Sequence, residues 1–174
     1  MHQEDLKSLF DQQAPTYDKQ WARMAPIRDC LHFLVASFFA DLPADARILC
    51  VGVGTGLEIA HLARTFPGWR FTAIDPSGAM LDACRTRAEV EGFGTRCDYH
   101  QGYLETLPAK ELHDGATCFL VSQFIVEERD RTQFFRAIAD RLKPGGLLAS
   151  ADLASYVGSN DYEWLLRALI GMMS

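Results

Sequence analysis

The sequence contains no run of basic residues, and this absence bears on its partners. Lys and Arg together number 17 against 23 Asp and Glu, which gives a formal net charge of −6. Proteins that bind nucleic acids neutralise phosphates with a basic stripe or patch. We therefore expect no nucleic-acid partner, whereas a small-molecule substrate is left open.

The sequence also lacks a cysteine pairing pattern, a signal peptide and a long apolar run. Its five cysteines are irregularly spaced and no CxxC occurs, so neither a disulfide framework nor a metal site is expected. Unpaired thiols fit a reducing compartment, and we expect a cytoplasmic protein. The start, MHQEDLKSLF, has no basic segment followed by an apolar one, and stretches such as LHFLVASFFA are too short to span a membrane.

Short apolar runs alternate with amphipathic segments along the chain. Strands alternating with helices of about 10–15 residues predict βαβ units and a parallel sheet. We therefore predict the α/β class, with a doubly wound, mostly parallel sheet and helices on both faces. The expected strands are residues 47–51, 69–74, 97–100, 115–121 and 147–153, and the expected helices are 4–11, 23–40, 57–66, 78–91, 131–142 and 162–172. In helix 23–40 apolar residues recur at helical spacing, which places Ile27, Leu31, Leu34, Val35 and Phe38 on one side.

The first expected strand leads directly into Gly52-Val53-Gly54-Thr55-Gly56 and then a helix. Glycines at this turn let the backbone approach a ligand closely and adopt positive φ, and the helix start offers free N–H groups. A tight turn without a ligand is the alternative. The dinucleotide fingerprint places its third glycine at the position of Leu57, and no GK[ST] follows. Neither a nicotinamide site nor a P-loop is therefore predicted.

The second expected strand stops at Asp75, roughly twenty residues after the glycines, where a carboxylate can accept hydrogen bonds from ribose hydroxyls. An Asx turn at Asp75-Pro76-Ser77 is the alternative, and the two roles are compatible. Ligands of such sheets bind at the carboxyl ends of the strands, near the switch point in strand order. Both motifs lie at that edge.

These motifs occur in a recognisable order: ILCVGVGTG, FTAIDPSGAML, HQGYLETLP, DGATCFLVSQFI and LKPGGLL. The combination resembles class I S-adenosylmethionine-dependent methyltransferases, and FDQQAPTYDKQW resembles the cap segment of their small-molecule type. The resemblance implies a Rossmann-like methyltransferase fold and S-adenosylmethionine as the cofactor, with S-adenosylhomocysteine as its product.

The resemblance also implies positions for the cofactor-binding residues, but no catalytic residue and no metal. Each of these positions has an alternative without a ligand: Met80 and Leu104 could simply pack in the core, Tyr17 could be an exposed aromatic residue, and Gln123 could lie in a solvated loop. Glu127 and Glu128 could act as general bases, or they could be an acidic pair at the start of a helix, where negative charge is favourable. The implied contacts are Tyr17 over the methionine carboxylate, Gly52, Gly54 and Gly56 along the methionine and ribose, Asp75 on the ribose, Pro76 and Met80 on the adenine, Gly102, Tyr103 and Leu104 at the adenine edge, and Val121 and Gln123 beside the sulfonium.

Two residues depart from the family pattern. Cys50 stands where family members usually carry an acid that helps hold the cofactor's ammonium group, and a thiol is a poor substitute. Tyr103 stands where an Asp often lies near the adenine amino group.

The implied function is transfer of a methyl group from S-adenosylmethionine to a small-molecule acceptor, whose identity is not readable. The alternative is a domain that binds S-adenosylmethionine or S-adenosylhomocysteine, or regulates, without transfer.

We expect a single domain over residues 1–174, with an N-terminal helical cap over 1–40 and an α/β core over 46–174. The resemblance implies a seven-stranded sheet of order 3-2-1-4-5-7-6, and the sequence supplies five strands. We therefore expect the sixth and seventh strands to be absent and the core to be C-terminally short. The apolar fifth strand would then form an edge, and such edges invite pairing with a second copy into a homo-oligomer.

Overall fold

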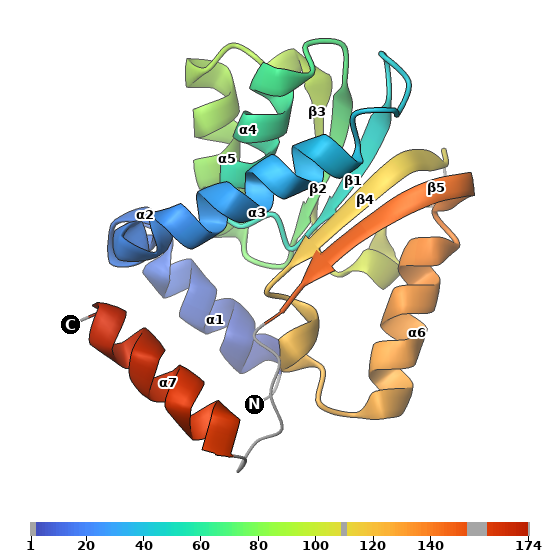
Figure 1. Cartoon of the computed structure of the whole chain (residues 1–174). Helices are drawn as coiled ribbons and strands as arrows, with labels where there is room; N and C mark the ends of the chain where they lie inside the picture. The colour runs from blue at the N-terminus through green and yellow to red at the C-terminus, as the bar shows by residue number, and fades with distance from the viewer. Residues whose placement is uncertain (1–2, 109–110, 153–159, 174) are drawn as a thin grey trace.

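Five strands form one sheet in the order β3-β2-β1-β4-β5, and every neighbouring pair is parallel (Figure 1). The computed structural model describes residues 3–108, 111–152 and 160–173. The strand bounds are β1 Arg47–Val51, β2 Arg70–Asp75, β3 Cys97–Gln101, β4 His113–Phe119 and β5 Leu142–Ala151. This parallel sheet, with its flanking helices, confirms the predicted fold class.

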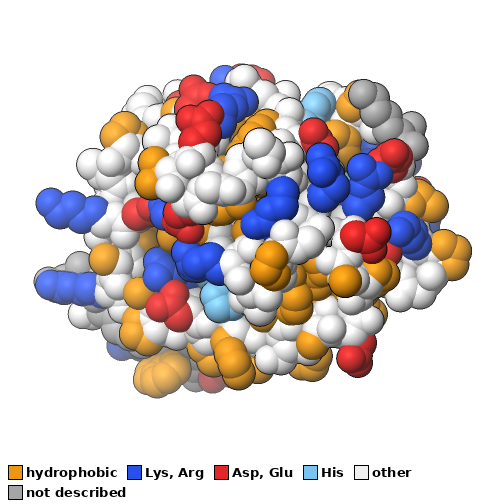
Figure 2. All heavy atoms as spheres, turned by 90° about the horizontal axis from the view of Figure 1, so that it is seen from above, with side chains coloured by type: hydrophobic (Ala, Val, Ile, Leu, Met, Phe, Trp, Pro, Cys, Tyr) orange, Lys and Arg blue, Asp and Glu red, His pale blue; other side chains and the backbone are white. Residues whose placement is uncertain are grey.

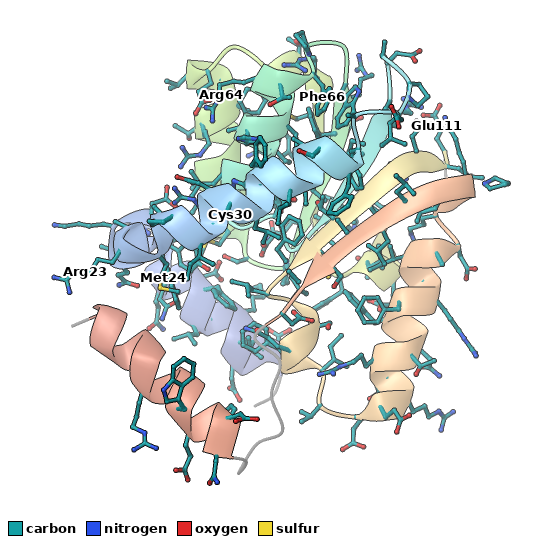
Figure 3. All side chains as sticks on the ribbon, in the orientation of Figure 1. Arg23, Met24, Cys30, Arg64, Phe66 and Glu111 are labelled. Atoms are coloured by element: carbon teal, nitrogen blue, oxygen red, sulfur yellow. The ribbon has the colours of Figure 1, made fainter. Side chains whose placement is uncertain are left out.

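Helices cover both faces of the sheet. The α-helices are α1 Gln3–Gln13, α2 Tyr17–Gln20, α3 Ala25–Phe38, α4 Leu57–Thr65, α5 Gly78–Val90, α6 Glu128–Ala139 and α7 Asn160–Met173. Single 3₁₀ turns occur at η1 Ala22–Met24, η2 Gly94–Arg96, η3 Leu104–Thr106 and η4 Ser122–Phe124. Arg23 and Met24 of η1 lie beside α7 (Figure 3).

The side chains of β1 alternate between two cores, as the period of a strand requires. Ile48 and Cys50 point to the core under α3, α4 and α5, whereas Leu49 and Val51 point to the core under α6. All four are buried, as is usual in a parallel sheet that is covered on both faces. Phe66 packs against the edge of the first core, where its ring stacks on Trp69 with ring centroids 3.7 Å apart (Figure 3).

The apolar side of α3 is only partly buried. Ile27, Leu34 and Phe38 are exposed by 56%, 44% and 71%, although Val35 is buried and Leu31 packs against the core. The helix instead buries the neighbouring stripe that contains His32, Val35 and Ala36. The His32 ring lies 5.7 Å from the ring of His61 on α4, so the approach of α4, rather than the apolar stripe, selects the buried face.

The boundaries of β4 and β5 also differ from the prediction. β4 ends at Phe119 because Leu120 adopts a left-handed conformation with φ 58°. β5 begins at Leu142, so it includes Pro144, and its register with β4 shifts between His113 and Gly115. Proline is tolerated there because β5 is an edge strand of the described sheet, where a missing N–H breaks no ladder.

The strand order reverses between β1 and β4, and α1 lies across the carboxyl ends of the strands (Figure 1). The face seen in Figure 2 carries basic side chains next to acidic ones and no patch of one sign (Figure 2). Within the described part of the chain, no helix combines the length and apolarity that a membrane span needs.

Candidate cofactor site

The loop after β1 is fixed to the end of β2 by backbone hydrogen bonds. The Gly52 and Val53 N–H groups both donate to the Ile74 carbonyl oxygen, at 2.8 and 3.0 Å. Gly52 and Gly54 have φ of 69° and 54°, which favours glycine. A Cβ on Gly52 would overlap the Val121 side chain, whereas a Cβ on Gly54 would meet open space. The loop therefore packs its backbone at Gly52 against the segment that follows β4 and presents its backbone at Gly54 to open space.

Asp75 ends β2 and joins two loops through its carboxylate. Its Oδ2 accepts the Gly54 N–H and its Oδ1 accepts the Ser77 N–H, both at 2.9 Å. Burial is the main cause that raises the pKa of Asp75 to about 6, and these two hydrogen bonds act against it. A carboxylate offers about four acceptor positions, so two remain for a ligand. The Asx turn at Asp75 is therefore compatible with the predicted ligand-binding role.

A cavity of about 740 Å³ opens at this edge of the sheet. Its floor is the glycine loop, Asp75 and the loop after β3, and its far side is α6 together with the segment that follows β4. Side chains of α1 and Tyr17 also line it. The cavity therefore lies at the switch point between β1 and β4, with the N-terminal helices as one wall.

Asp11 attaches α1 to the start of α5. Its Oδ1 accepts hydrogen bonds from the Ser77 hydroxyl at 2.6 Å and from the Ala79 N–H at 3.2 Å. The Ser77 hydrogen bond holds the pKa of Asp11 below its ordinary value. Since Ser77 also donates its N–H to Asp75, the N-terminal helix is two hydrogen bonds away from the Asp75 carboxylate.

Asp18 attaches α2 to the glycine loop. Its two oxygens accept the Thr55 hydroxyl at 2.6 Å and the Arg87 guanidinium at 2.5 Å. Arg87 also donates Nε–H to the Thr55 carbonyl oxygen at 3.0 Å. The neighbouring Tyr17, which lines the cavity, is held in position by this attachment.

The methyltransferase domain family matches residues 48–146, which is more than half of the chain. The chain belongs to this methyltransferase family. A similar relative is the ubiquinone biosynthesis O-methyltransferase of Methylocella silvestris, 31% identical over 157 residues, which cover 86% of this chain and 59% of the relative. Another is the fatty-acid O-methyltransferase of Mycolicibacterium smegmatis, 29% identical over 106 residues, which cover 61% and 36%.

Solved structures agree with the family. An S-adenosylmethionine-dependent methyltransferase from Thiobacillus denitrificans, in complex with S-adenosylhomocysteine, is 26% identical with a TM-score of 0.58 and covers 69% of this chain and 46% of that one. An O-methyltransferase family protein from Burkholderia thailandensis, 18% identical, matches 99% of this chain and 49% of that one with a TM-score of 0.68, which shows a shared fold. The chain spans about half the length of the curated relatives it matches.

The structure brings most of the predicted cofactor residues of this methyltransferase domain together. Gly56 and Gln123 are the exceptions, since neither lines the cavity. A Cβ on Gly56 would collide with Cys84, so this glycine permits the close packing of α4 on α5. Met80 and Leu104 are buried and also line the cavity, so core packing and the predicted cofactor contact are compatible at both positions. The predicted residues that line it are Tyr17, Gly52, Gly54, Asp75, Pro76, Met80, Gly102, Tyr103, Leu104 and Val121.

The departure at Cys50 is accompanied by a carboxylate from another element. Cys50 is fully buried, and it pairs in register with Thr117 of β4. Glu58, in the first turn of α4, accepts the Thr117 hydroxyl at 2.5 Å and also hydrogen bonds with the Cys50 thiol. Burial raises the pKa of Glu58 to about 7. An acid therefore lies behind the glycine loop, although it comes from the helix and does not line the cavity.

Sequence reasoning placed Tyr17 of the N-terminal cap and Val121 after the fourth strand at this site, but it did not name the apolar side chains of α1 and of the segment after β4 that form the wall. Leu6, Phe10 and Phe124 line the cavity, and the Phe10 and Phe124 rings meet edge to face at 5.9 Å and 78°. Glu127 and Asp130 line its rim, and Glu127 is the N-cap residue of α6. Asp11 and Asp18 read as ordinary helix acids, and no local signal marks their distant partners.

Proposed function

We propose that the chain binds S-adenosylmethionine in this cavity and transfers its methyl group to a small-molecule acceptor. The observation that carries the proposal is Asp75, whose carboxylate retains free acceptor positions beside the cavity and beside the open backbone at Gly54. Ribose hydroxyls are donors, and a carboxylate at the end of the second strand is their usual partner. Met80 and Leu104 offer apolar surfaces for the adenine.

When bound, S-adenosylmethionine would be held by Asp75 and the backbone at Gly54, and it would supply an electrophilic methyl carbon for a lone pair of the acceptor; the electron pair of the broken carbon–sulfur bond would stay on sulfur, and the acceptor proton would pass to solvent. The residues of the chain contribute orientation and exclusion of water. Gly52 lies in the floor and packs on Val121 of the far side, and Tyr17, held by the neighbouring Asp18, covers the cavity from the N-terminal side. No described residue has to act as a covalent nucleophile.

The acceptor atom is proposed to be a hydroxyl oxygen. Several relatives carry names of O-methyltransferases, such as the enzyme of ubiquinone biosynthesis and the fatty-acid enzyme. These relatives are longer than this chain, so the acceptor of the chain itself stays a proposal.

The test combines binding and turnover. Calorimetric titration with S-adenosylhomocysteine measures the cofactor site, and incubation with methyl-labelled S-adenosylmethionine and a panel of small hydroxylated acceptors measures transfer. Saturable binding with labelled product supports the proposal. Saturable binding without product over the whole panel would favour the alternative, a binding or regulatory domain. If the folded chain does not bind S-adenosylhomocysteine, both the transferase proposal and the alternative of a binding domain are refuted.

Three further points are proposed on the same basis. Residues 1–174 act as one domain, with a cap over 1–40 attached to the core over 46–174 through Asp11 and Asp18. A cytoplasmic location is supported by five free thiols. Self-association through the β5 edge is supported by Leu147 and Leu148, which are 40% and 37% exposed there. The predicted lack of a nucleic-acid partner stays a prediction.

A further inference from the structure

Arg141 joins two sides of the cavity through its guanidinium. The residue lies between α6 and β5, directly before the LKPGG segment. Its Nη2 donates to the Leu104 carbonyl oxygen at 2.9 Å, and its Nη1 donates to the Ala137 carbonyl oxygen at 2.8 Å. Leu104 belongs to the floor of the cavity and Ala137 to its far side. One side chain therefore holds the loop after β3 against α6.

The backbone of Arg141 is itself fixed by the sheet. Its carbonyl oxygen accepts the His113 N–H at 2.8 Å and lies 3.2 Å from Nδ1 of the same histidine, which is buried at the start of β4. From this fixed point the Nη2 also donates to the Leu107 carbonyl oxygen at 3.3 Å. Because Leu104 begins η3 and Leu107 directly follows it, the guanidinium binds both ends of this turn.

Arginine suits this position because its planar guanidinium carries five donors in a fixed fork. Ala137 lies in the last turn of α6, where carbonyl oxygens lack helical partners and a cation is favourable. A lysine ammonium carries its three donors on one atom, so it would not span the two elements in the same way. The side chain therefore acts as a rigid link between η3 and α6.

This link is costly, which distinguishes it from ordinary packing. Among the residues that the structure describes, the partners of the Arg141 side chain are carbonyl oxygens, and its buried Nε has no hydrogen-bond partner. A buried donor without a partner costs free energy and calls for an explanation. Leu104 is 2% exposed and already packs in the core under α6. The guanidinium therefore adds direction to the Leu104 backbone rather than more burial.

We propose that Arg141 is a positioning residue of the cofactor site, which sets the separation of η3 from α6 where the adenine binds. The inference rests on the proposed function, in which Leu104 offers an apolar surface to the adenine. Arg141 does not line the cavity, so it acts through Leu104 and not by touching the ligand. Without this link the loop has to be ordered when the cofactor binds, and affinity falls by that cost.

The first test removes the guanidinium. Calorimetric titration of the full chain with S-adenosylhomocysteine should show an affinity about tenfold lower in Arg141→Ala, the size expected when hydrogen bonds from a charged group are lost. Arg136→Ala is the matched control, since Arg136 is exposed on α6 and does not line the cavity, and it should leave the affinity unchanged. An arginine that only stabilises the fold would leave the affinity of the folded variant unchanged, and that result would overturn the proposal.

Chemical rescue separates the guanidinium fork from its charge. Ethylguanidinium added to Arg141→Ala should restore most of the lost affinity, whereas ethylammonium at the same concentration should not. Restoration by both cations alike, or by neither, would contradict the proposed role of the fork.

A measurement on the unmodified chain applies even if Arg141→Ala does not fold. The Nη resonances of Arg141, followed by nuclear magnetic resonance, should shift as S-adenosylhomocysteine saturates the chain, because their Leu104 partner lies in the cavity floor. Saturation without a shift would refute the proposal. Absence of saturable S-adenosylhomocysteine binding by the unmodified chain would instead refute the proposed function.

Discussion

Removing the Asp75 carboxylate should separate cofactor affinity from stability. In Asp75→Ala, the ligand loses hydrogen bonds to a charged acceptor, which contribute about 1.5–3 kcal/mol. Affinity for S-adenosylhomocysteine should therefore fall by roughly 10–100-fold. The free energy of unfolding should change less, because the lost Gly54 and Ser77 hydrogen bonds are offset by removal of a buried charge whose pKa is raised to about 6.

The pH dependence gives the same prediction a second readout. The folded-state pKa of about 6 exceeds the ordinary value of 3.8, so protonated Asp75 contributes stability at low pH that is lost as the pH rises through about 6. The ionised form accepts both ribose donors, so affinity should fall as the pH drops through about 6.

Calorimetry from pH 5 to 8 and urea unfolding measure the two quantities. Asp98→Ala, at an exposed carboxylate on β3, is the control and should change neither. A folded Asp75→Ala variant with unchanged affinity at pH 7.5 would refute the ribose assignment.

Four further predictions address other parts of the molecule. Asp18→Asn weakens a half-exposed ion pair and should raise the dissociation rate of S-adenosylhomocysteine roughly threefold in stopped-flow displacement. Burial lowers the pKa of His32 from 6.5 to about 4, so the neutral ring stabilises the fold, and this stability is lost as the pH falls from 6.5 toward 4. His32→Leu should therefore reduce the difference between the melting temperatures measured at pH 5 and pH 7. Cys50→Asp places a second buried carboxylate beside Glu58 and should lower the free energy of unfolding, measured by urea titration, by roughly 2–4 kcal/mol. The double variant Cys50→Asp/Glu58→Gln should regain part of this free energy, because only one buried carboxylate is left. NAD should show no saturable micromolar binding in competition calorimetry, because Leu57 replaces the third glycine of the dinucleotide motif.

The sheet was predictable because its central strands contain short apolar runs bounded by turn residues, as in RILCV of β1, and central parallel strands bury both faces. The buried face of α3 was not predictable in the same way. Its exposed apolar stripe of Ile27, Leu34 and Phe38 is as regular as a core stripe, and only the position of α4 selects the stripe with His32. The end of β4 was equally hidden, because nothing local marks a leucine for positive φ.

The floor of the candidate site was predictable for a geometric reason. Carboxyl ends of parallel strands meet at one edge, so residues after β1, β2 and β3 converge whatever their separation along the chain. The wall from α1 and the carboxylate of Glu58 depend on contacts between distant elements. Glu58 reads as an ordinary first-turn acid, and only the fold places it against Thr117 and Cys50.

The most direct test of the central proposal is an amide chemical-shift map of the labelled chain during titration with S-adenosylhomocysteine. The largest shifts should occur at Gly54, Ser77 and Leu104, whose backbones flank Asp75 and the cavity, and should saturate at one equivalent. Shifts confined to other surfaces, such as the exposed stripe of α3, or no saturable shifts in a folded sample, would contradict the assignment of this cavity to the cofactor.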